Sequence, residues 1–150
     1  MTTREALLLR LQNVEVLLRA IERELPRLLP QKEDLPVERS GSTRKLVIPG
    51  VAGAEGITCY ATLNRYPDGR PGELFLVGEK TGSLVGGLLD ALSIAVSTEL
   101  QWGVPIQDLV QKFRHTRFEP CGFTGDTELP FAASITDLLA QWIEKKTNCP

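Results

Sequence analysis

A tetrapeptide between a predicted strand and a predicted helix, Lys80-Thr81-Gly82-Ser83, has the residue types of a phosphate-binding corner. The first N–H groups of a helix, the positive end of its dipole and a lysine side chain can together hold an anion. The segment lacks the full G-x-x-x-x-G-K-[ST] pattern, so phosphate catalysis of the P-loop type is not expected. In the alternative reading, Thr81 or Ser83 caps the helix and Gly82 makes the turn.

A second basic group lies in a glycine-punctuated loop predicted over residues 114–130. Its members are Arg114, His115 and Arg117. Two arginines beside a histidine could grip a nucleotide phosphate and support a ligand at the first corner, with Phe118 or Phe123 stacking on a base. Alternatively, an arginine pairs with Glu119 or Asp126 and pins the loop. A lone histidine more often has a structural role than a catalytic one, so no catalytic residue is predicted.

The cysteines are three in number and widely spaced, at Cys59, Cys121 and Cys149. An odd number without a close pair favours a reducing cytoplasm over a disulfide framework. With one histidine and no Cys-x-x-Cys pair, a zinc site built by this chain is not expected, and no metal is predicted. Cys121 is expected to be a small packed residue, unless Arg117 lowers the pKa of its thiol.

The chain length and charge fit one soluble domain with an appended helix. The 150 residues suffice for a core without metal or disulfide. The net charge of −2 argues against direct DNA binding. No uninterrupted apolar run approaches the roughly 18 residues of a membrane span, so no membrane association is expected.

The first 30 residues predict an amphipathic helix that self-associates. Their apolar side chains recur at alternating intervals of four and three, as on the a/d seam of a coiled coil. These residues are Leu7, Leu11, Val14, Leu18, Ile21, Leu25 and Leu28. Pro26 is expected to end or kink the helix near Leu25. We expect a homo-oligomer through this helix; the alternative is that the helix packs on its own domain.

The remainder predicts a linker over 31–44 and an α+β domain over 45–150. A strand at 45–49 joins a hairpin at 57–79, whose first strand alternates apolar and polar residues. The resulting antiparallel sheet should pack on a long central helix at 83–102.

The helices after the hairpin are placed by their apolar patterns. In the long helix, one face is expected to point inward; it carries Leu84, Leu88, Leu92, Ala95 and Val96, and Val85 and Leu89 widen it. A short helix should run from Pro105 to Phe113. The last helix, from about Ala132 to Lys146, should turn five residues inward: Ile135, Leu138, Leu139, Trp142 and Ile143.

Three long stretches resemble one known family. They are "LPVERSGSTRKLVIPG", "RYPDGRPGELFLVGEKTGSLVGGLLDALSIAVSTELQWGVP" and "DLVQKFRHTRFEPCGFTGD". They are similar to the C-terminal region of adenosylcobalamin-dependent (class II) ribonucleotide reductases, also called the TSCPD domain. The resemblance covers roughly residues 34–146, which is most of the chain after the first helix.

This resemblance implies that the chain lacks two parts of the family's reductases, the cobalamin-binding barrel and the redox-active cysteine pair. The reductases of the family carry radical chemistry in a large barrel that holds the cobalamin, and 150 residues cannot supply it. Adenosylcobalamin would therefore belong to a partner subunit, and no cofactor is expected on this chain. The family also has a redox-active cysteine pair in its tail, whereas this tail has Cys149 alone, which the resemblance makes a possible redox thiol. One thiol cannot perform intramolecular dithiol exchange, so catalysis by this chain alone is not expected.

Two functions of different classes follow. The first is an accessory domain in deoxyribonucleotide synthesis, acting with a separate reductase large subunit. The second is an independent oligomer that sequesters or senses a nucleotide, cyclic nucleotides included. A scaffold without a ligand is the third and plainest reading.

Overall fold

The computed structural model describes residues 1–148, which form two separate units. One comprises residues 1–31 and contains a single helix, and the other begins at Lys32. The predicted redox thiol, Cys149, lies outside the described residues.

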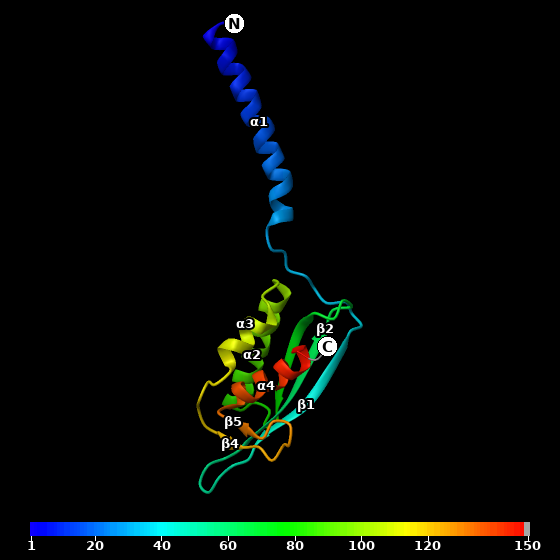
Figure 1. The fold of residues 1–150 in the computed structure, drawn as a ribbon, viewed down its shortest axis with the longest axis vertical. Helices are drawn as coiled ribbons and strands as arrows, with labels where there is room; N and C mark the ends of the chain where they lie inside the picture. Colours follow the sequence, from blue (N-terminus) through cyan, green and yellow to red (C-terminus); the bar gives the residue numbers. More distant parts are fainter. Residues whose placement is uncertain (149–150) are drawn as a thin grey trace. The chain divides into compact units, whose positions relative to one another are not determined.

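The first unit is helix α1 (Thr3–Leu28), drawn in blue in Figure 1. Its N-terminus has a capping box, in which Glu5 N–H donates to Thr2 Oγ1 (3.3 Å) and Thr2 N–H donates to Glu5 Oε2 (2.7 Å). The helix continues through Pro26 to Leu28, so of the two predicted effects of Pro26, an end or a kink near Leu25, the end is not observed. Proline removes only one N–H donor so close to the helix end, and Leu29 N–H still donates to Leu25 C=O at 3.1 Å.

The second unit contains a three-stranded antiparallel sheet in the order β1-β2-β3. Its strands are β1 (Ser40–Ile48), β2 (Ile57–Arg65) and β3 (Pro71–Gly78), so the predicted hairpin is confirmed. β1 starts five residues before the predicted strand, inside the predicted linker, because its polar first half pairs fully with β2. Thr43 Oγ1 lies 2.7 Å from Thr62 Oγ1 across this pair, a polar contact that an apolar pattern does not reveal.

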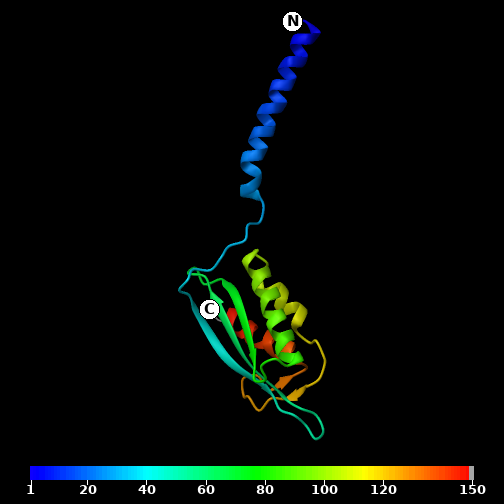
Figure 2. The ribbon, with the colours of Figure 1, turned by 180° about the vertical axis from the view of Figure 1, so that it is seen from behind.

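Helix α2 (Leu84–Gln101) runs alongside β3, as both views show (Figures 1 and 2). β3 pairs with β2 on one edge only, and α2 serines satisfy the backbone on its other edge. Ser93 Oγ accepts from Leu76 N–H (2.8 Å), and Ser97 Oγ accepts from Leu74 N–H (2.9 Å). The helix therefore closes the edge of the sheet through hydroxyl groups.

The predicted inward face of α2 is right only in part, since Leu89 and Val96 are buried and Leu92 packs on the core. The buried residues are Leu89, Ser93, Val96 and Leu100, of which the prediction contained Leu89 and Val96. Leu84 and Leu88, both predicted to be inward, are 79% and 61% exposed. Two of the inward positions are serines that bond to β3, and leucines remain on the exposed side of the helix.

Two further helices complete the core. α3 (Ile106–Phe113) follows Pro105 as predicted, and α4 (Ile135–Asn148) buries all five side chains predicted to point inward. α4 begins three residues later than expected because β5 (Phe131–Ala132) pairs with β4 (Gly122–Phe123), inside the predicted loop. The α+β class is thus confirmed.

Among residues 1–148, α2 is the one helix long and apolar enough to cross a membrane by length and composition. A core helix of a soluble protein meets the same test, so this property alone does not place α2 in a membrane.

Candidate functional site

A pocket of about 260 Å³ opens at the N-terminus of α2. Lys80, Ser83 and Gly86 line it from the first turn of the helix and the segment before it. Glu55 lines it from the connection between β1 and β2, and Pro120 from the loop before β4. The predicted phosphate corner therefore lies at a real hollow of the structure.

Within this pocket, Ser83 is the N-cap of α2. Its Oγ accepts from Gly86 N–H (3.0 Å) and donates to Lys80 C=O (2.8 Å). Gly82 has a φ of +76°, a conformation that favours glycine. The alternative reading, a cap at Ser83 and a turn at Gly82, is thus confirmed. The cap does not seal the corner, because Lys80, Thr81 and Gly82 are exposed.

The charges of the pocket are mixed. Lys80 Nζ pairs with Glu55 Oε1, and both side chains are largely exposed. The hydrogen bond from Lys80 lowers the pKa of the Glu55 carboxyl. Glu79 adds a second carboxylate to the lining. An anion that enters this pocket must therefore draw Lys80 away from Glu55.

The structure does not place the second basic group in this pocket. None of Arg114, His115 and Arg117 lines it. Arg114 Nη1 instead donates to Asp137 Oδ1 at 2.6 Å, and its Nε lies 3.4 Å from Glu144. In the alternative reading, an arginine pins the loop by pairing with Glu119 or Asp126; Arg114 does so through Asp137 and Glu144 instead.

Asp137 fixes the start of the loop. Its carboxylate also accepts the backbone N–H of His115 (2.8 Å), which holds this residue at a φ of +64°. Burial alone would raise the pKa of Asp137, but backbone donors at Ala133 and His115, with Gln141 and Arg114, outweigh it and lower the pKa. Asp137 is 3% exposed, so this charged network has a structural role that the sequence reading missed.

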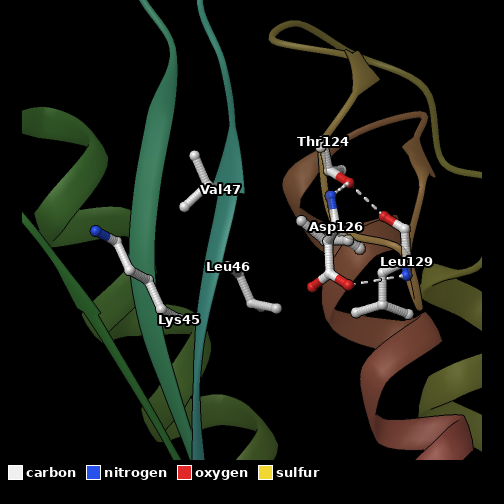
Figure 3. Close-up of a pocket in the computed structure, with 8 residues that line it drawn as sticks. Lys45, Leu46, Val47, Thr124, Asp126 and Leu129 are labelled. Carbon is white, nitrogen blue, oxygen red and sulfur yellow. Dashed lines mark hydrogen bonds between the residues drawn. The ribbon is translucent and has the colours of Figure 1, made fainter.

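A second pocket, of about 280 Å³, lies between β1 and the loop after β4 (Figure 3). Leu46 points from the strand toward the loop. Thr124 Oγ1 accepts from Asp126 N–H (3.0 Å) and donates to Leu129 C=O (2.5 Å), which gives the loop its shape. Asp126 is also the partner of Arg44, which lowers the pKa of its carboxyl. The side chains of Thr124 and Asp126 in this pocket thus already bond to other groups of the protein.

A third hollow, a groove of about 510 Å³, lies between α2 and α3. Its walls include the apolar residues Leu92, Ala95, Leu109 and Phe113. The exposed stripe of α2 continues from this groove. We call the exposed residues Leu84, Leu88, Ala91 and Ala95 the α2 outer face.

The remaining reactive groups do not form a catalytic arrangement. Cys59 is buried, and burial raises the pKa of its thiol to about 11, which disfavours the thiolate. Cys121 is half-buried, and no disulfide joins it to Cys59. Within residues 1–148, no group of three or more His, Cys, Asp or Glu is placed to hold a metal ion.

The sequence reading missed both Glu55 and Pro120 as pocket residues. Each comes from a loop far from residue 80 in the chain, and no local pattern marks it. The buried face of α2 did carry a signal. Ser93 and Ser97 lie one turn apart in an otherwise apolar helix, which is the spacing needed to reach two N–H groups of one strand.

The described residues thus define a small α+β domain whose sheet edge is closed by a helix that is apolar on its outer side. The sequence model of the TSCPD domain matches residues 32–147. Because this match covers most of the chain, the chain belongs to the TSCPD domain family.

Curated relatives carry the same region within much longer chains. The chain is 43% identical over 114 residues to a vitamin B12-dependent ribonucleotide reductase of Rhodopirellula baltica, covering 76% of this chain and 10% of the relative. It is 43% identical over 126 residues to the protein of that name from Streptomyces clavuligerus, covering 84% and 12%. For that of Streptantibioticus cattleyicolor, the identity is 46% over 110 residues, covering 73% and 17%. No solved structure matches the chain.

Proposed function

We propose that this protein is an accessory domain that acts with a separate cobalamin-dependent ribonucleotide reductase subunit in deoxyribonucleotide synthesis, in the cytoplasm, and is not catalytic alone. The relatives named above support the pathway. The chain spans about a tenth of the length of the first of them, so the catalytic chemistry is assigned to the partner.

The observation that carries this proposal is the exposed α2 outer face. Leu84 and Leu88 expose 79% and 61% of their surface, although both lie on an ordered helix. A domain that sits within a longer chain commonly has an apolar surface of this kind where it packs against its neighbour. When the domain is a separate chain, the same face can bind the neighbour as a subunit.

We assign adenosylcobalamin, like the catalytic chemistry, to the partner subunit. The three hollows described above have volumes of about 260, 280 and 510 Å³, and each is too small to enclose a corrinoid with its nucleotide loop. These volumes support our proposal that adenosylcobalamin binds to the partner subunit.

Co-purification tests this function. A tagged copy of this chain, expressed in its native cells, is expected to retain a cobalamin-dependent reductase subunit, identified by mass spectrometry. Leu88→Asp should abolish the retention because it places a charge in the apolar contact. Val51→Asp is the matched control, since Val51 is 70% exposed and lies outside the α2 outer face. Retention of no reductase subunit by the unmodified chain would refute the proposal.

The pocket at the N-terminus of α2 favours a second function, the binding of a nucleotide through its phosphates, for sequestration or sensing. Support comes from the open corner, the lysine and the helix end, which complement an anion. Glu55 opposes it by competing for Lys80. Arg114, His115 and Arg117 stay proposed as basic support, although Arg114 already pairs with Asp137.

Thermal shift measurements with mono-, di- and cyclic nucleotides at millimolar concentration test this second function. A ligand bound to the folded state raises the melting temperature by an amount set by its concentration relative to Kd. Lys80→Ala should remove the shift, whereas Lys45→Ala, an exposed lysine on β1, should keep it. Glu55→Gln should enlarge the shift because it frees Lys80. Arg117→Ala will reduce the shift only if this arginine supports the ligand. No shift with any nucleotide would refute this function.

A further inference from the structure

Helix α1 exposes all its large apolar side chains. Even the most covered of them, Leu25, is 47% exposed, and no residue of the helix is buried. An isolated helix of this length is marginal in water, and its stability comes from packing of its apolar face. The ordered turns of α1 therefore call for another apolar helix surface.

The spacing of these side chains indicates what that surface is. In a heptad repeat, the a positions of α1 are Leu11, Leu18 and Leu25. The d positions are Leu7, Val14, Ile21 and Leu28. The repeat holds from Leu7 to Leu28 without a polar interruption, and it matches a helix that has the same repeat. A second copy of α1 has it by construction.

We propose that α1 assembles four copies of this chain into a parallel four-helix coiled coil. The a positions carry leucine, and the central d positions carry the β-branched residues Val14 and Ile21. Leucine at a with a β-branched residue at d favours more than two strands. Leu8 and Leu17 occupy e and g positions, which widens the apolar stripe beyond what a two-stranded seam covers.

The charges beside the seam fix the parallel orientation. Arg10 is at a g position, and Glu15 is at the e position five residues later. In a parallel bundle these two positions lie next to each other on adjacent helices, so Arg10 of one copy meets Glu15 of the next.

Light scattering of the full-length protein tests the assembly. The expected mass is four times the 16.5 kDa of one chain. Leu11→Asp with Leu18→Asp should reduce it to the mass of one chain. The matched control is Leu9→Asp with Val16→Asp, because these exposed residues lie at f positions, away from the seam. Trp102 and Trp142 both belong to the second unit, so their fluorescence reports whether that unit stays folded in each variant.

A second variant tests the strand number without removing apolar volume. The variant carries Leu11→Ile, Leu18→Ile and Leu25→Ile with Val14→Leu and Ile21→Leu, and it should form a dimer instead of a tetramer.

The parallel orientation is tested by Arg10→Glu, which should promote dissociation, and by its combination with Glu15→Arg, which should restore the tetramer. A monomeric, dimeric or trimeric unmodified protein would overturn the proposal, as would a seam variant that keeps the tetramer.

Discussion

Both long faces of α2 carry leucines, but only the inner face is buried, and only this face also carries serines that bond to the sheet edge. The side packed on β3 contains Ser93 and Ser97, whose hydroxyls bond to the strand backbone. The outer side contains Leu84 and Leu88 and is exposed. A helix beside the edge of a sheet must satisfy the free N–H groups of the edge strand, so hydroxyls are useful on its inner side. The leucines outside are then available for a different contact.

Alanine substitutions at two neighbouring leucines, one buried and one exposed, should give the largest difference in the free energy of unfolding. Leu89 is 5% exposed and Leu88 is 61% exposed. Leu89→Ala should lower the free energy of unfolding by about 2–4 kcal/mol, because it leaves a cavity in the core. Leu88→Ala should change it by less than about 0.5 kcal/mol. Urea unfolding followed by tryptophan fluorescence measures both, and equal losses would contradict the assignment of the two faces.

The hydroxyl of Ser93 should have the next largest effect. Ser93→Ala leaves the N–H of Leu76 without its acceptor in a buried place, at a cost of about 1–3 kcal/mol. Thr98→Ala is the control, since Thr98 is exposed and its hydroxyl donates only to Ile94 C=O of its own helix. If the two variants are equally stable, closure of the sheet edge by α2 is not a source of stability.

These particulars show how far the sequence predicts the fold. The hairpin and α4 were predicted because each has one clear periodicity and one buried face. The inner face of α2 was predicted only in part, because a hydrophobicity pattern includes Leu89 and Val96 but scores Ser93 as polar and does not see the strand backbone that it contacts. The polar half of β1 was missed for a similar reason, since its pairing with β2 depends on backbone hydrogen bonds.

The candidate site was predictable only where it is local. The corner at Lys80 and Ser83 follows from a turn and a helix start that are adjacent in sequence. Glu55, Pro120 and Asp137 come from distant segments, and only the folded chain brings them to their partners.

The stability that Asp137 provides to the loop should depend on pH in the acid range, whereas the stability from the apolar packing of α2 should not. The pKa of Asp137 in the folded chain is below its ordinary value of 3.8, so its ionised form stabilises the fold above that pH. This stabilisation is lost as the pH falls from 3.8 through the folded pKa. The difference in unfolding free energy between the unmodified protein and Asp137→Asn should therefore shrink on acidification, whereas the loss caused by Leu89→Ala should not. Parallel pH profiles would contradict this separation.

The N-cap of α2 should have the smallest of these effects on stability. Ser83→Ala removes the hydroxyl that accepts from Gly86 N–H, at a cost of about 1 kcal/mol. Thr81→Ala, at an exposed neighbouring position, should leave the melting temperature unchanged. An equal loss in both variants would mean that Ser83 has no special part in starting the helix.

The central claim is that the outer face of α2 binds a separate reductase subunit, and a direct titration tests it best. The purified full-length chain is titrated against the purified cobalamin-dependent subunit, by calorimetry, beside its Leu88→Asp variant. We predict saturable binding that weakens at least about tenfold in the variant, as for a residue at the centre of an interface, with unchanged folding. Equal affinity of the two proteins, or no binding by the unmodified chain, would contradict the account.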